Sequence, residues 1–134
     1  MKKRAYYGSQ HLKAHKAWTA FSKYIRTKDK VCISCKTGKA DTAGHFIPGS
    51  VCGKELFFSE FNVNGQCTSC NLWKHSNGAE YAIALQKKYG KKILEQLDRT
   101  RKQEYKSGII CRYKPEELKE IEKTYQQKLL DLES

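Results

Sequence analysis

Two pairs of cysteines constrain the fold of this chain more than any other feature. Cys32 and Cys35 form the first pair, Cys67 and Cys70 form the second, and thirty-one residues lie between the pairs. A gap of two residues lets both thiolates of a tight turn face one cation, and two such turns complete a tetrahedral shell around zinc. Because four thiolates leave no position for a substrate, the pattern predicts a structural zinc site with a long insertion between its halves.

Roles for the cysteines other than zinc binding fit the sequence less well. Four buried free cysteines would need the doubled spacing by chance, and a redox pair would need a βαβ context that neither motif has. Residues 1–4, Met-Lys-Lys-Arg, are not followed by the apolar core of a signal peptide, so we expect the chain to stay in the reducing cytosol. Disulfides are rare there, which disfavours a disulfide framework. No stretch approaches the roughly 20 apolar residues of a membrane span, so we expect a cytoplasmic protein without membrane contact. Cys52 and Cys111 have no partner at ligand spacing and are expected to be buried.

The chain carries an excess of positive charge that is unevenly distributed. Its 26 Lys and Arg residues outnumber 14 Asp and Glu, giving a formal net charge of +12, and residues 1–30 hold nine Lys or Arg against one acid. Such asymmetry is typical of a surface that faces a polyanion, most often nucleic acid, with a solvated basic face as the alternative. The side chains expected to contact DNA are Lys13, Lys16, Lys23, Arg26 and Lys74.

The apolar pattern predicts one small α+β domain. With 39% hydrophobic residues in a chain of 134, the core is expected to be thin and to need a metal staple. Short strands are expected around 42–47 and 56–61, and helices over 9–27, 71–89 and 91–106, with a break at Asn77-Gly78. Core packing is the favoured role of the apolar stripe of the first helix, formed by Leu12, Trp18, Phe21 and Ile25. Tyr6, Tyr7 or Trp18 would contact nucleic acid only if exposed.

A last helix is expected to begin at Pro115, after an extended piece over 109–113. Proline suits the first turn of a helix, and Glu116 and Glu117 complement the positive end of its dipole. The apolar residues of this helix share one face: Leu118, Ile121, Tyr125, Leu129 and Leu132. Such a stripe packs on its own domain or on a second copy, so a homodimer is the less common alternative.

The residues between and after the cysteine pairs form an ordered motif. His45 is followed by Phe46-Ile47-Pro48, Asn62 lies five residues before Cys67, and Asn71 directly follows Cys70. In these spacings the chain resembles the His-Asn-His (HNH) endonucleases that carry a four-cysteine zinc site. The resemblance implies a small ββα-metal core with structural zinc, flanked by α-helices. It divides the chain into a basic N-terminal helix over 1–30, a zinc-stapled HNH-like nuclease core over 31–90 and a helical C-terminal extension over 91–134.

The resemblance also implies a role for each motif residue. His45 would be the general base, Asn62 would brace the loop that aims it, and Asn71 would take the metal-ligand position usually held by His. His75 lies one helical turn beyond Asn71, so both side chains can face the same cation. These residue types suit phosphodiester hydrolysis, because a neutral imidazole can deprotonate water and a divalent cation, magnesium or manganese, can stabilise charge on the phosphate.

Two departures from the motif bear on activity. The residue before the base, often an Asp or His ligand in these enzymes, is Gly44, and Asp41 is the nearest carboxylate that could serve. The last motif residue is Asn71 rather than His, although an amide oxygen still suits a hard cation.

A wider similarity extends over most of the chain. Residues 17–26, the Cys32–Cys35 pair, Ala43 to Phe46, Asn62-Val63, 67–71 and the tail from about Tyr113 to Tyr125 resemble the NinG/Rap recombination proteins of lambda-like phages. This resemblance implies a phage-encoded endonuclease that acts on branched DNA, Holliday junctions and D-loops, during homologous recombination in the cytoplasm of a bacterial host. The preference for junctions rests on the family alone.

Two further functions stay open at the level of sequence. A zinc-containing DNA-binding or junction-binding module without turnover is suggested by Gly44 and Asn71. A zinc-knuckle protein-interaction module is suggested by the tail helix, but it leaves the basic excess unexplained.

Overall fold

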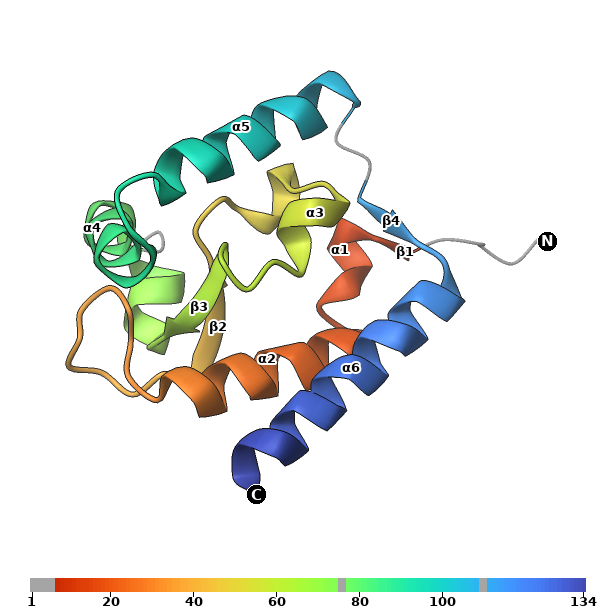
Figure 1. Ribbon diagram of the computed structural model, residues 1–134, viewed down its shortest axis with the longest axis horizontal. Helices are drawn as coiled ribbons and strands as arrows, with labels where there is room; N and C mark the ends of the chain where they lie inside the picture. Colours follow the sequence, from red (N-terminus) through yellow and green to blue (C-terminus); the bar gives the residue numbers. More distant parts are fainter. Residues whose placement is uncertain (1–6, 75–76, 109–110) are drawn as a thin grey trace.

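The computed structural model describes residues 7–74, 77–108 and 111–134, with side chains from His11 onward, and shows a small α+β fold (Figure 1). The helices are α1 Ser9–Leu12, α2 Lys16–Asp29, α3 Lys54–Phe57, α4 Gly78–Tyr89, α5 Ile93–Lys106 and α6 Pro115–Glu133. Two shorter turns are η1 Gly49–Val51 and the π-helical η2 Ser69–Trp73. The strands are β1 Tyr7–Gly8, β2 Thr42–His45, β3 Val63–Gln66 and β4 Arg112–Tyr113.

The apolar stripe predicted for the first helix is buried, and it is divided between α1 and α2. Leu12, Phe21 and Ile25 are fully buried and Trp18 is 9% exposed. The single helix expected over 9–27 is wrong in one respect, because the chain breaks after Leu12 and restarts at Lys16. His15 begins the new helix, since its Nδ1 accepts a hydrogen bond of 3.0 Å from the N–H of Ala17.

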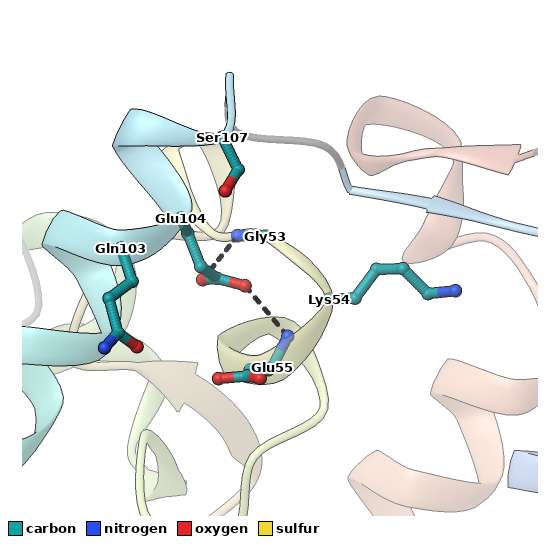
Figure 2. Close-up of a pocket in the computed structure, with 6 residues that line it drawn as sticks. All are labelled: Gly53, Lys54, Glu55, Gln103, Glu104 and Ser107. Carbon is teal, nitrogen blue, oxygen red and sulfur yellow. Dashed lines mark hydrogen bonds between the residues drawn. The ribbon is translucent and has the colours of Figure 1, made fainter.

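Strands β2 and β3 pair antiparallel, with Thr42 opposite Gln66 and His45 opposite Val63. The first strand was predicted, but the second was expected at 56–61 and lies instead at Val63–Gln66. Residues 54–57 form the short helix α3, because Glu104 of α5 accepts hydrogen bonds from the N–H groups of Gly53 (2.8 Å) and Glu55 (2.9 Å). Figure 2 shows the Glu104 carboxylate reaching across to these two nitrogens from α5.

The C-terminal helix packs within the chain. Figure 1 shows α6 crossing beside α2, and the rings of Phe21 and Tyr125 meet edge to face with centroids 4.7 Å apart. Leu118 is fully buried, and Ile121 packs against the same core. The predicted stripe is therefore confirmed over its first half, whereas Leu132 near the end is 45% exposed.

One hydrophobic core connects the helices at both ends of the chain to the β2–β3 pair. Its buried members run from Leu12 to Leu118 and include Val63 and Tyr81. The expected break before α4 is confirmed by Asn77, which adopts a left-handed conformation with φ of 47°. None of the helices in the described ranges is both long and apolar enough to cross a bilayer.

Candidate functional site

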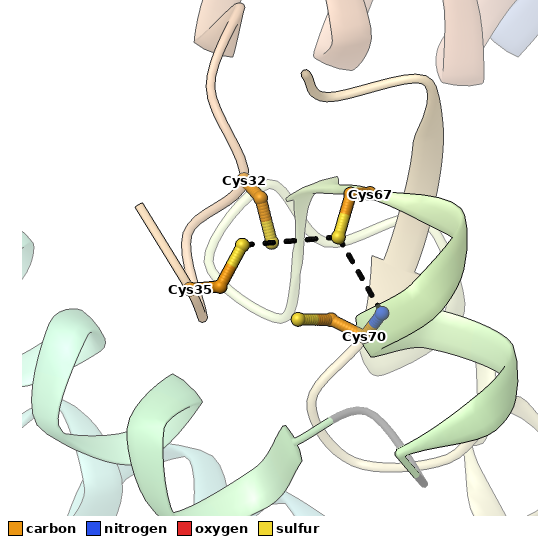
Figure 3. A group of neighbouring side chains, drawn as sticks. All are labelled: Cys32, Cys35, Cys67 and Cys70. Carbon is orange, nitrogen blue, oxygen red and sulfur yellow. Dashed lines mark hydrogen bonds between the residues drawn. The ribbon is translucent and has the colours of Figure 1, made fainter. Parts of the chain in front are cut away.

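The four cysteines of the two pairs form one cluster. Their Sγ atoms lie within 4.8 Å of one another, and those of Cys35 and Cys67 are 3.8 Å apart. In Figure 3 all four side chains point inward, two from the loop after α2 and two from the segment after β3. A tetrahedron with Zn–S bonds of 2.3 Å has edges of about 3.8 Å. The cluster therefore fits a four-thiolate metal site and is consistent with structural zinc.

Hydrogen bonds and burial change the pKa values of two cysteines in the cluster. Backbone N–H groups of Thr37 and Gly38 lower the pKa of the Cys35 thiol to about 6, which favours the thiolate that binds metals. Burial raises the pKa of Cys70 to about 12, so its thiolate needs a neighbouring cation. Gly38 is required here because a Cβ at this position would lie 2.8 Å from that of Cys67.

The remaining two cysteines are buried outside the cluster, as predicted. Cys52 is completely buried and donates a hydrogen bond of 3.3 Å to the carbonyl of Ile47. Cys111 is 6% exposed, and burial raises the pKa of both thiols to about 12. Both behave as small apolar residues with protonated thiols at neutral pH.

His45 ends strand β2 and is held in one orientation. Its ring is 5% exposed and stacks on Trp18, with centroids 5.2 Å apart and planes inclined by 11°. Nε2 lies 2.9 Å from the carbonyl oxygen of Phe57, and a carbonyl can only accept, so Nε2 carries the proton and Nδ1 is the basic nitrogen. Burial, with a smaller contribution from the charge of Lys13, lowers the pKa of His45 to about 4. The imidazole is therefore neutral at pH 7.

Asn62 holds together the two ends of the segment between the strands. Its side chain is fully buried, and its Oδ1 accepts from the N–H of Ile47 at 2.7 Å. Its Nδ2 donates to the carbonyls of Ile47 (3.1 Å) and Leu56 (3.2 Å). Leu56 directly precedes Phe57, whose carbonyl contacts His45, so Asn62 is hydrogen-bonded to the backbone next to that carbonyl.

Asn71 lies on the other side of β2 from His45. Consecutive residues on a strand face opposite sides, and Asn71 faces the position of Gly44 whereas His45 contacts Trp18 and Phe57. The Nδ2 of Asn71 donates to the Oγ1 of Thr42 at 3.1 Å. The structure thus gathers Asn71 with Gly44 and Thr42, and it places His45 across the strand.

The other predicted metal ligands are placed differently. Asp41 precedes β2, and its Oδ1 accepts from the N–H (2.9 Å) and hydroxyl (3.1 Å) of Thr68 in the second cysteine turn. One carboxylate oxygen is therefore already engaged by the protein. His75 lies outside the described residues, so its role as a metal ligand stays a prediction.

Two of the predicted DNA-contacting residues line a basic cleft of about 460 Å³. The cleft lies between the end of α2 and the loop that leads to β2, and its walls are formed by Lys23, Arg26, Thr27, Lys30, Lys39, Ala40 and Asp41. Lys13 and Lys16 lie near the start of α2, roughly 15 Å along the helix from Arg26. Lys74 is exposed beyond Asn71. The cationic surface thus divides into a cleft near the cysteine cluster and a patch at the other end of α2.

Sequence reasoning missed several residues of this region. Lys30 and Lys39 also line the basic cleft. The only sequence signal for them was their position on either side of the first cysteine pair. Trp73, two residues after Asn71, is 78% exposed, and its neighbour Leu72 is 63% exposed. Trp18, which was considered for contact with nucleic acid if exposed, is instead buried against His45.

Comparisons with known proteins identify the family of the chain. The family model described as Bacteriophage Lambda NinG protein matches residues 1–134. The chain is 33% identical to Protein ninG of Salmonella phage P22 and 32% identical to Protein ninG of Escherichia phage lambda, each over 98% of this chain. Protein ninG of Escherichia phage 933W is 31% identical over the same share.

The chain spans 60–61% of the length of these relatives. No solved structure matches it. The family model covers the four clustered cysteines, His45, Asn62 and Asn71, so all the geometry described above lies within the matched region. The chain therefore belongs to the NinG family of lambdoid phage proteins.

Proposed function

We propose that the chain is a metal-dependent endonuclease of the HNH type that cleaves branched DNA. The observation that carries the proposal is the state of His45, a neutral imidazole at the end of β2 with one nitrogen committed to the carbonyl of Phe57. A histidine fixed in one tautomer with a basic Nδ1 has the properties of a general base for water. Asn62 supports this role, because it ties down both ends of the loop that carries Phe57.

The residues near Asn71 fit a hard divalent cation. Thr42 donates its hydroxyl proton to the carbonyl of Gln66 at 2.7 Å, so its oxygen accepts from the Nδ2 of Asn71. The Oδ1 of Asn71 must then face Gly44, away from Thr42. Amide oxygens are suitable ligands for magnesium or manganese, which when bound would stabilise negative charge on the scissile phosphate.

The remaining features supply support and substrate binding. Zinc in the four-cysteine cluster is structural in this proposal, because its shell would be full, and it clamps the segments that flank β2 and β3. The basic cleft would hold DNA phosphates, which Lys and Arg bind without regard to sequence. Exposed Trp73 offers a flat ring on which an unpaired base at a branch can stack. The choice of Holliday junctions and D-loops comes from the resemblance to the recombination proteins.

A second candidate function is a junction-binding module without turnover. The observation in its favour is the burial of His45, of which only 5% is exposed, so that a water bound to Nδ1 needs a local opening of the loop. Gly44 adds to it, because this position provides no carboxylate ligand. Both candidates require the basic cleft and the zinc cluster, and they differ only in turnover.

Cleavage of a labelled four-way junction separates the two functions. Wild type, His45→Gln and His45→Ala are compared on the junction, linear duplex and single strand with EDTA, magnesium or manganese. Cys111→Ala is the matched control, because it alters a buried residue outside the site. Metal-dependent cutting by wild type and Cys111→Ala, with loss in both His45 variants, supports the endonuclease.

Zinc content and melting temperature are measured for every variant, so that loss of the fold is not mistaken for loss of the base. Junction binding without cutting by wild type in either metal favours the binding module. Cutting that persists in both His45 variants removes His45 as the base.

A further inference from the structure

The space above Gly44 is occupied by amide oxygens from two other segments. A Cβ built on Gly44 would lie 1.8 Å from the Oε1 of Gln66 and 3.1 Å from the Oδ1 of Asn71. Gln66 belongs to β3, and Asn71 follows the last cysteine in η2. Two carbonyl-type oxygens therefore lie within 3.1 Å of the single point where a side chain at position 44 would begin.

Hydrogen bonds turn both oxygens toward that point. The amide nitrogen of Asn71 is committed to Thr42, which leaves its Oδ1 directed at Gly44. The Nε2 of Gln66 donates to the Oγ of Ser34 at 2.8 Å, so its Oε1 lies on the opposite side of the amide group. Gln66 is fully buried and Ser34 is 2% exposed, so this orientation is held inside the protein.

The two amide oxygens lie close to the position where HNH nucleases often have a metal-binding side chain. In the HNH pattern that the chain resembles, the residue before the base often supplies a metal ligand, and here that residue has no side chain. The oxygen of Gln66 lies 1.8 Å from the point where the first atom of such a side chain would be. It comes from the strand paired with β2, at the position opposite Thr42.

We infer that Gln66 is a ligand of the divalent cation, acting with Asn71 in place of the side chain that Gly44 lacks. The inference rests on the proposed metal-dependent function and names a residue for it. Both ligands are neutral oxygens, which suit magnesium or manganese and disfavour softer metals. Because neither carries charge, the site alone binds weakly, and the DNA phosphate adds the negative charge that a carboxylate would otherwise supply.

The competing role for Gln66 is structural. Gln66 links β3 to Ser34 in the first cysteine turn, and that link alone would justify a buried amide. The two roles differ in what a change of the oxygen does. A structural amide affects zinc content and stability, whereas a ligand affects the affinity for manganese at constant zinc content.

Binding of Mn²⁺ to the zinc-loaded chain, followed by EPR of the free ion from micromolar to millimolar concentrations, tests the inference without relying on cleavage. Gln66→Glu places a charged oxygen at the same point and is expected to tighten Mn²⁺ binding by roughly tenfold or more. Gln66→Met keeps the length of the side chain, removes the oxygen and is expected to weaken or abolish binding.

Two further variants complete the test. Gln126→Glu is the matched control, because it makes the same substitution at an exposed position of α6, away from the β2–β3 pair, and its Mn²⁺ affinity is expected to equal that of wild type. The double variant Gly44→Asp/Gln66→Ala moves the oxygen ligand from position 66 to position 44. It is expected to bind Mn²⁺, in contrast to Gln66→Met. Zinc content and melting temperature are recorded for each variant.

The outcomes separate this inference from the proposed function. Equal Mn²⁺ affinity in wild type, Gln66→Glu and Gln66→Met, or no binding in any of them, overturns the ligand role, even where wild type cuts junctions through His45. A stepwise change of affinity across the three proteins supports the ligand role, even where no DNA is cut.

Discussion

The indole ring of Trp18 lies flat against the imidazole of His45, with ring centroids 5.2 Å apart and planes inclined by 11°. Trp18 belongs to α2, the helix whose basic face was predicted to contact DNA. The same ring has the ammonium group of Lys13 above it at 5.8 Å from the centroid. Helix α2 thus provides one wall of the histidine pocket, and Lys13, just before the helix, provides a cation beside it.

The first prediction concerns stability and pH. The pKa of His45 is lowered to about 4 in the folded chain, below its ordinary value of 6.5. The stabilisation from the neutral ring is therefore complete above about pH 6.5 and is lost as the pH falls toward 4, because the unfolded chain binds the proton first. We expect a loss of about 3 kcal/mol across that window. Urea unfolding of the wild type at several pH values measures it.

The matched comparison is His45→Gln, which keeps a side chain of similar size without a titrating ring. Acid also weakens the zinc thiolates, but this effect is common to both proteins and cancels in the difference. Parallel pH profiles for wild type and His45→Gln would contradict the prediction.

The second prediction concerns Gly49, which faces the basic edge of the imidazole. A Cβ on Gly49 would lie 3.5 Å from the Nδ1 of His45 and 3.2 Å from the ring of Phe57. If Nδ1 is the base, Gly49→Ala crowds its approach, and junction cleavage should fall by roughly tenfold or more. Junction affinity, measured by fluorescence anisotropy, should stay unchanged. Cleavage at the wild-type rate by a folded Gly49→Ala protein would indicate that Nδ1 does not act on the water.

The third prediction concerns zinc. Cys67→Ser removes one of four clustered thiolates and should eliminate stoichiometric zinc and unfold the chain around β2 and β3. Cys111→Ala, which alters a buried cysteine outside the cluster, should keep its zinc and lose only the stability of a small cavity. Elemental analysis and circular dichroism measure both. Full zinc content in a folded Cys67→Ser protein would show that the cluster does not hold the metal.

The fourth prediction concerns the basic cleft. Arg26→Gln and Lys39→Gln each remove a cation that lines the cleft. Each should lower DNA affinity on all sequences and reduce the slope of log affinity against log salt by about 0.9 if one phosphate contact is lost. Lys119→Gln, an identical change of charge on the exposed face of α6, is the control. Equal salt slopes for all four proteins, wild type included, would place the DNA elsewhere.

The fifth prediction concerns Trp73. Stacking of a base on an aromatic ring contributes about 1–3 kcal/mol, so Trp73→Ala should weaken binding to a four-way junction by roughly fivefold or more and leave linear duplex unaffected. Tyr105→Ala removes another exposed aromatic residue, 70% exposed on α5, and serves as the control. An equal loss on junction and duplex would assign Trp73 to general contact with DNA.

The helices were predictable because their apolar residues recur at helical spacing. The stripe of α2 follows from such spacing, whereas the start of α6 at Pro115 and the break at Asn77 follow from local helix-start and turn signals. The cysteine cluster was predictable because its geometry follows from two local turns of fixed spacing. In each case the signal lies within a few neighbouring residues.

Strand β3 was misplaced because both of its faces are buried although one of them carries polar side chains. Asn62, just before the strand, and Asn64 and Gln66 within it stand at alternate positions, yet all three are fully buried. Each amide is held by groups distant in sequence, such as Ile47 for Asn62 and Tyr81 for Asn64. A pattern method assigns alternating amides to solvent, and only the tertiary partners reveal that they face inward.

The sequence also did not predict which side of β2 each site residue faces. Spacing predicted His45, Asn62 and Asn71 as a set, but it could not show that His45 and Asn71 lie on opposite sides of β2. The proximity of Gln66 to Gly44 depends on the register of β2 and β3. Because the second strand was predicted at the wrong residues, this proximity could not be predicted.

That proximity restricts how the family can diverge at this position. An acidic residue at 44 requires the end of the Gln66 side chain to move, because the first side-chain atom at 44 would lie 1.8 Å from the Gln66 oxygen. The two positions are therefore coupled sterically, because the glycine on one strand makes room for the long side chain on the other. Homologues with an acid before the histidine are therefore expected to carry a shorter residue in place of the glutamine.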